Sequence, residues 1–239
     1  MSKIIASGNG QLLTNVHNAN PVSRRNFLGY AGGAAALAMA LTACDKNDDD
    51  DDNDNGIDLG SGDVGILNYA YALEQLEAAF YTKVLESPYA SIPAAEAALL
   101  KDIRDHEIAH REFFKAALGS GAIKALTPDW GALDFTKRDQ VLGAAKAFED
   151  LGVAAYNGAG KLISTTTNGK AYLTLAGKIV SVEARHAAYI RDLLQNGTFA
   201  DSTIVDANGL DAAKPPSEVL VTANMYLSTK VSGRNLPTS

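Results

Sequence analysis

A chain of 239 residues, 46% of them hydrophobic, has room for one ordinary globular domain with appended segments. Its net charge of −7 argues against nucleic-acid binding, which needs a basic surface. The single cysteine, Cys44, excludes an intrachain disulfide, a thiolate zinc site and a rubredoxin-type iron centre.

Residues 1–43 are predicted to be a targeting segment. They contain three basic residues and no acidic one, and Arg24 and Arg25 stand before a Gly/Ala-rich apolar stretch too short to span a membrane. The arginine pair resembles a twin-arginine export signal. Leu41-Thr42-Ala43-Cys44 resembles a lipoprotein processing site, with Cys44 as the lipidated residue; a plain signal peptide with an incidental cysteine is the alternative. We therefore expect export and a lipid anchor in the cell envelope, on the periplasmic face or at the cell surface, with the membrane as a partner.

Residues 44–62 are predicted to form an acidic linker. Removal of the targeting segment would leave 18 basic and 28 acidic residues, a net charge of −10. Five consecutive aspartates, Asp48 to Asp52, repel one another and keep such a segment extended. We interpret it as a solvated spacer between lipid and domain. It also resembles the acidic stretch that marks some Gram-negative lipoproteins for the cell surface.

Hydrophobic residues recur at three- and four-residue steps and predict four helices within residues 63–196. Their expected ranges are 63–86, about 91–118 with Ser91 as N-cap, about 136–163 with Thr136 as N-cap, and, after a turn at 165–169, onward to about Gln195. The connections are therefore short, long and short. The middle link of roughly seventeen residues could reach about 55 Å, whereas a 26-residue helix is only about 39 Å long.

These connections let the second and third helices run parallel. The expected fold is an all-α, ferritin-like four-helix bundle with one crossover, followed by a C-terminal extension over residues 197–239. Within that extension, a short helix is predicted from Ser217 to about Ser228, with no function assigned.

Each predicted apolar helix face carries a glutamate near its middle, namely Glu74, Glu107, Glu149 and Glu183. In the second and fourth helices the acid is followed three residues later by His110 and His186, and residues three apart lie on one face of a helix. In the first and third helices it is followed seven residues later by Tyr81 and Tyr156, within reach of a hydrogen-bond network. The two halves form an internal repeat, offset by 75 residues at the first acids and by 76 at the second.

Buried carboxylates without a cation cost several kcal/mol each, and a domain is stable by only about 5–15 kcal/mol. Two metal ions would remove this cost. Oxygen-rich ligation with two imidazoles suits iron or manganese, while zinc and copper stay open on affinity grounds; we expect iron first and manganese second.

The repeated Glu-x6-Tyr and Glu-x-x-His patterns resemble those of rubrerythrin in the ferritin-like superfamily. The surrounding residues are more similar to a family of exported bacterial ferritin-like proteins that includes plant desiccation-related proteins. Three stretches carry this likeness: Leu73-Glu74-Gln75-Leu76-Glu77-Ala78-Ala79-Phe80-Tyr81, Phe148-Glu149-Asp150-Leu151-Gly152-Val153-Ala154-Ala155-Tyr156 and Arg185-His186-Ala187-Ala188-Tyr189-Ile190-Arg191.

The resemblance implies a role for each site residue. Glu74 and Glu149 would be terminal ligands, one for each metal, while the remaining two glutamates, Glu107 and Glu183, would bridge the metals. His110 and His186 would supply the nitrogens. Glu77, one turn from Glu74, is an alternative or additional ligand. Tyr81 and Tyr156 are the candidate catalytic side chains, acting through hydrogen bonds.

Three functions fit such a site. The first is an oxidoreductase of peroxidase, catalase or ferroxidase type that acts on peroxide or oxygen. Because the chain has no rubredoxin cysteines, a peroxidase would need an external electron donor. The second is metal binding or storage, and the third is a structural surface lipoprotein without turnover. A homodimer is compatible with all three.

Overall fold

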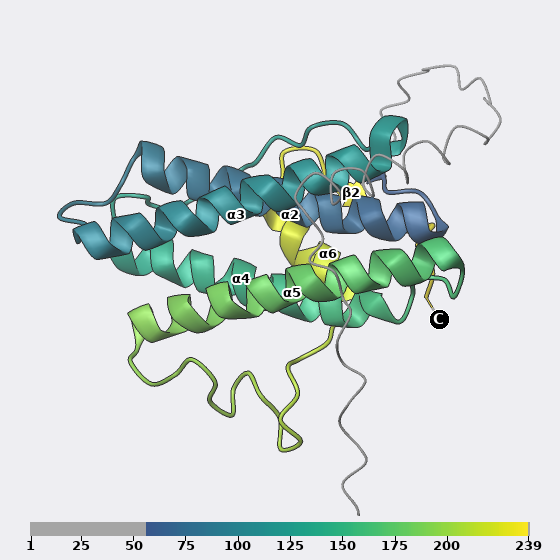
Figure 1. The fold of residues 1–239 in the computed structure, drawn as a ribbon. Helices are drawn as coiled ribbons and strands as arrows, with labels where there is room; N and C mark the ends of the chain where they lie inside the picture. The colour runs from purple at the N-terminus through teal and green to yellow at the C-terminus, as the bar shows by residue number, and fades with distance from the viewer. Residues whose placement is uncertain (1–55, 239) are drawn as a thin grey trace, which may run out of the picture.

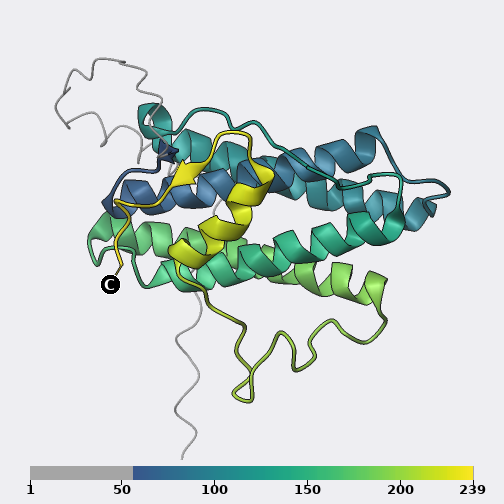
Figure 2. The same ribbon diagram turned by 180° about the vertical axis from the view of Figure 1, so that it is seen from behind.

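Four long helices form the body of the molecule, and the expected fold class is confirmed. The computed structural model describes residues 56–238. The helices, in chain order, are α2 (Gly62–Glu86), α3 (Ala94–Leu118), α4 (Arg138–Gly160) and α5 (Thr167–Leu194). α2 packs mainly against α3, and α4 against α5, so the bundle consists of two helical hairpins (Figure 1). The connection between α3 and α4 runs back along the bundle, which makes these two helices parallel (Figures 1 and 2).

The starts of three helices differ from the prediction, first those of α3 and α5. Ser91 is not an N-cap: it lies in the turn before α3 with a positive φ of 59°, and the helix begins after Pro93. The fourth helix begins at Thr167, inside the predicted turn 165–169 and so earlier than expected. The Thr166 hydroxyl caps it by accepting a hydrogen bond from the backbone N–H of Gly169 at 3.0 Å.

The third helix also begins later than predicted. Thr136 is not its N-cap; the capping position is Lys137 and the helix starts at Arg138. The Thr136 hydroxyl instead donates to the carboxylate of Asp134 at 2.6 Å, and its backbone N–H donates to the same oxygen at 2.9 Å. The threonine therefore closes a turn within the crossover, in competition with the helix.

The two ends of the described chain meet on one side of the bundle. Strand β1 (Ile57–Asp58) pairs in parallel with β2 (Val231–Ser232), and Leu59 is completely buried. The predicted linker 44–62 therefore ends inside the folded domain, while the predicted targeting segment and Cys44 lie outside the described residues.

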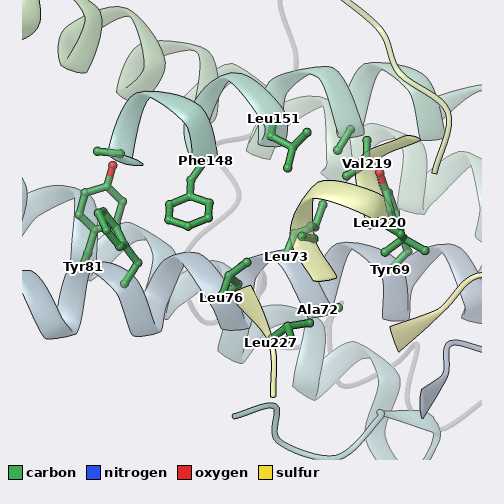
Figure 3. Close-up of a cluster of buried hydrophobic side chains, with 14 of the residues drawn as sticks. Tyr69, Ala72, Leu73, Leu76, Tyr81, Phe148, Leu151, Val219, Leu220 and Leu227 are labelled. Carbon is green, nitrogen blue, oxygen red and sulfur yellow. The ribbon is translucent and has the colours of Figure 1, made fainter. Parts of the chain in front are cut away.

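The C-terminal extension is part of the core. The short helix predicted from Ser217 to about Ser228 is present as α6 (Pro216–Ala223) but ends earlier, where a 3-10 turn, η3 (Asn224–Tyr226), follows it. Another 3-10 turn, η2 (Gly119–Gly121), follows α3. α6 lies across α2 and α4 (Figure 2). Its buried Val219 and Leu220 sit close to Tyr69 of α2 (Figure 3).

Aromatic rings join the two hairpins beside the middle of the bundle. Phe80 of α2 and Phe148 of α4 lie with ring centroids 5.0 Å apart. Trp130 from the crossover is 5.8 Å from Phe80, and Tyr226 from the C-terminal extension is 4.7 Å from Phe148. The crossover and the extension thus contribute to the same core as the helices, and the ring of Tyr81 packs edge-on against Phe80 with centroids 5.1 Å apart.

The helices of the described part of the chain, residues 56–238, include none that is both long and apolar enough to cross a membrane.

The approach of the extension to α4 depends on a glycine. The backbone N–H of Lys214 donates to the carbonyl of Ala154 at 2.9 Å, and a Cβ added to Gly158 would lie 1.8 Å from the Lys214 carbonyl oxygen. A side chain at residue 158 would therefore force the extension away from the helix.

We predict that Gly158→Ala lowers the free energy of unfolding by about 1–3 kcal/mol, the usual cost of overpacking. The matched control is Gly143→Ala on the same helix, where an added Cβ meets no atom within 4 Å. There the better helix propensity of alanine should raise stability by about 0.5–1 kcal/mol. Urea unfolding of both variants measures the difference, and equal effects would contradict the close contact.

Candidate metal centre

All four predicted glutamates lie in the middle of the bundle, one on each long helix. Glu74, Glu107, Glu149 and Glu183 each have no exposed surface. The side chain of His186 is 5% exposed and that of His110 is 13% exposed. Helical spacing produces this arrangement, because each acid replaces one core residue on a face that is otherwise apolar.

The six side chains gather into two groups that share two members. Glu107 and Glu183 belong to both groups. Glu74 and His110 complete the first group, Glu149 and His186 complete the second, and within each group the candidate ligand atoms all lie within 4.8 Å of one another. This is the spacing expected for donors that surround a single ion, and the shared glutamates place the two groups side by side.

The nitrogen–oxygen distances repeat between the two groups. Nδ1 of His110 lies 2.9 Å from Glu183 Oε1 and 3.4 Å from Glu74 Oε2. Nδ1 of His186 lies 2.8 Å from Glu107 Oε1 and 3.5 Å from Glu149 Oε2. Each histidine is therefore nearest to the glutamate of the other hairpin's Glu-x-x-His pair, so the internal repeat of the sequence is also a repeat in space.

The ligand atoms of this cluster face one another at ion-pair distance but make no regular hydrogen bond. Ten buried side-chain nitrogen and oxygen atoms in the described residues have no hydrogen-bond partner, and eight of them belong to the six predicted ligands. They are Glu74 Oε2, both carboxylate oxygens of Glu107 and of Glu183, Glu149 Oε2 and Nδ1 of both histidines. Buried polar atoms are normally satisfied. Carboxylate oxygens and imidazole nitrogens that converge without partners fit a pair of metal ions.

Two tyrosines hold the remaining carboxylate oxygens, and they do so crosswise. Tyr81 of α2 donates to Glu149 Oε1 of α4 at 2.5 Å, and Tyr156 of α4 donates to Glu74 Oε1 of α2. Each tyrosine thus supports the acid of the other hairpin rather than the acid on its own helix. The bond leaves Oε2 of each glutamate facing the cluster.

Glu77 is buried but belongs to neither group. It is 4% exposed, and its Oε1 would lie 3.0 Å from a Cβ added to Gly152. Gly152 follows Glu149 by three residues as Glu77 follows Glu74, so the glycine leaves room for the acid at the matching point of the repeat. Burial and the charge of Glu107 hold the pKa of Glu77 well above its usual range.

Burial and mutual repulsion dominate the electrostatics of the other acids. Burial and the charge of Glu183 raise the pKa values of Glu74 and Glu107. Burial likewise raises the pKa of Glu149 to about 7, against the opposing effect of His186. Burial would also raise the pKa of Glu183, but its two histidine neighbours lower it to about 2.

The neighbouring carboxylates favour the protonated, positively charged form of both imidazoles. Burial alone would lower the pKa of each histidine. The carboxylates beside His110, those of Glu107, Glu183 and Glu74, instead raise its pKa to about 12. The carboxylates of Glu107, Glu149 and Glu183 have the same effect on His186. Without metal, these two cations are the charges that compensate the acids.

One further residue lies at the site, His106, which the sequence left open as either a residue behind the ligands or a surface residue. Nδ1 of His106 lies 2.9 Å from Nε2 of His186, the nitrogen that faces away from the carboxylates. His106 falls outside the apolar face of its helix, so the helical pattern gave it no role. Its position one turn before His110 is the only sequence signal that points to the site.

A bundle of four helices with one crossover and a core of carboxylates and imidazoles defines the ferritin-like class of protein. Comparison with protein families agrees with this class. Residues 62–196, more than half of the chain, match the family described as the ferritin-like domain. The chain therefore belongs to that family. A search of curated proteins found no match.

The shifted pKa values predict that the metal-free domain loses stability as the pH rises from 5 to 8. A group whose pKa is raised on folding stabilises the fold below its unfolded pKa and loses this effect as the pH rises through its folded pKa. For Glu149 this stability is lost between pH 4.5 and about pH 7, and for the two histidines between pH 6.5 and about pH 12. Glu183 acts in the opposite sense, but only below pH 4.5.

Melting temperatures of the chelated protein across this pH range test the prediction. Glu149→Gln, which cannot titrate, should reduce the slope between pH 4.5 and 7. Asp139→Asn, at a side chain that is 94% exposed on the same helix, should leave it unchanged. A melting temperature independent of pH would contradict the assignment.

Proposed function

We propose that this chain is a di-metal carboxylate protein, with iron as the first choice and manganese as the second, and that it acts as an oxidoreductase on peroxide or oxygen. The observation that carries the proposal is the set of eight buried ligand atoms without hydrogen-bond partners. Four enclosed carboxylates would otherwise destabilise the core, since each buried charge costs several kcal/mol.

Each residue of the cluster has a role in this proposal. Glu74 and His110 would hold one ion, and Glu149 and His186 the other. Glu107 and Glu183, common to both groups, would bridge the two ions. Oxygen ligands with one imidazole for each ion suit iron and manganese, and such a pair supplies redox chemistry toward oxygen or peroxide when bound.

The tyrosines keep the terminal glutamates in place for this chemistry. A hydrogen bond from Tyr81 or Tyr156 fixes one oxygen of each carboxylate and directs the other toward the ion. The chain has a single cysteine, so a reaction that consumes electrons needs an external donor, whereas disproportionation of peroxide needs none.

The purified chain should contain two metal ions and consume hydrogen peroxide, alone or with an added reductant. Chelation should lower the melting temperature, because a metal at a thousandfold excess over its Kd stabilises the folded state by about 4 kcal/mol. Glu107→Ala should abolish peroxide consumption, since it removes a ligand common to both ions. Elemental analysis, melting curves and a peroxide assay on one preparation provide the measurements.

The matched control is Glu112→Ala, which removes a half-exposed glutamate from the same helix and should change nothing. Metal without peroxide consumption would favour metal binding, storage or a structural role. A protein that binds no metal and melts identically with and without chelator would contradict the di-metal site.

We also propose that the protein is exported by the twin-arginine route and anchored through Cys44 in the cell envelope. The support is the arrangement of Arg24, Arg25, the short apolar stretch and Cys44 in the sequence. Export of a folded chain would allow the metals to be bound before translocation.

Cys44→Ser should release the protein from the membrane fraction or leave it unprocessed, and replacement of Arg24 and Arg25 by lysine should stop export. Fractionation and mass spectrometry of the N-terminus measure both effects. If the Cys44→Ser protein stays with membranes after a high-salt wash, the anchor lies elsewhere.

A further inference from the structure

His106 forms a second layer behind one of the two histidines. It lies on the exposed surface of α3, and its ring is nearly parallel to that of His186 on α5, with an angle of 7° between the planes. Its Nδ1 is 2.9 Å from His186 Nε2. The other nitrogen of His186, Nδ1, faces Glu107 and Glu149.

The chemistry of imidazole determines which group donates in this contact. A neutral imidazole has one proton, so a ring that binds a metal through Nδ1 carries its proton on Nε2. His186 would therefore donate from Nε2–H to Nδ1 of His106. His106 must then be the acceptor, with its own proton on Nε2.

The second half of the repeat has no histidine that corresponds to His106 and could support His110 in the same way. His106 directly precedes Glu107, and the residue that directly precedes Glu183 is Val182, whose side chain accepts no hydrogen bond. In the described part of the chain, no side chain or backbone group hydrogen-bonds to the outer nitrogen of His110. The His110 side chain is also more exposed than that of His186, 13% against 5%.

We propose that His106 is a positioning residue that makes the two metal positions unequal. Its hydrogen bond orients the ring of His186 and strengthens it as a ligand, so the position formed with Glu149 and His186 binds metal more tightly than the one formed with Glu74 and His110. Removing a partner of this kind typically weakens metal affinity about 10–100-fold. The inference rests on the proposed di-metal site.

Titration of the metal-free chain with Zn²⁺ against a competing chelator tests the inequality, with zinc as a redox-silent probe. The wild type should take up two ions with separate affinities. His106→Ala should weaken the tighter one about 10–100-fold and leave the weaker one unchanged. His106→Asn should restore much of the loss, because its side-chain oxygen can accept near the place of Nδ1. Val182→Ala, at the matching position of the repeat, should behave as the wild type.

Nitrogen-15 NMR of the histidine side chains in the zinc-loaded protein supplies a readout that a merely structural role would not change. The Nε2–H of His186 should be protected from solvent exchange in the wild type, His106→Asn and Val182→Ala, and lose that protection in His106→Ala. The inference is overturned if His106→Ala binds zinc as the wild type does. It is also overturned if both affinities fall together with the metal-free melting temperature. A wild type that binds no zinc would instead refute the di-metal site itself.

Discussion

The structure depends on one constraint, which is that four carboxylates lie in the centre of a hydrophobic core. Glu74, Glu107, Glu149 and Glu183 have no exposed surface, and within residues 56–238 two imidazoles alone stand beside them as compensating charges. Such a cluster can persist only where the surrounding fold holds its members in place or where cations join it. The crossover holds the members in place, because it brings the Glu-x-x-His pairs of two similar hairpins to the same point in the bundle. The crossed tyrosine bonds then tie the first helix of each hairpin to that of the other.

Departures from the repeat are as informative as the repeat itself. Glu77 faces Gly152 at equivalent positions, and His106 corresponds to Val182. Both differences place an additional polar group on the first hairpin. Two identical halves would make two identical ion positions, whereas these substitutions give each position different neighbours.

Much of the site could be predicted from the sequence because helical geometry is local. The period of 3.6 residues decides which side chains share a face, so an acid on an apolar face was recognisable in each helix. The seven-residue step to Tyr81 favoured Glu74, with Glu77 kept as an alternative or additional ligand. One feature that was missed is local: the Thr136 hydroxyl bonds to Asp134, two residues away, instead of capping the helix. The contact between His106 and His186 is not local, because no helical period connects residues on two different helices. The strand pair between the two ends of the domain is equally non-local.

The four helices are buried to different extents by the rest of the chain, and this determines which side of the cluster lies nearer to solvent. α2 buries 17 of its 25 residues and α4 buries 13 of 23, because α6 and the chain ends lie over them. α3 buries only 6 of 25 and α5 only 7 of 28. Both histidines of the cluster, and His106 with them, come from these two open helices, whereas the tyrosines come from the covered pair. The α3–α5 side is therefore the less covered side of the cluster, and its imidazoles, rather than the aromatic core, lie nearest to solvent there. On that side His110 is the more exposed of the two histidines and His186 is screened by His106, so the two candidate ion positions differ in exposure as well as in their hydrogen bonds.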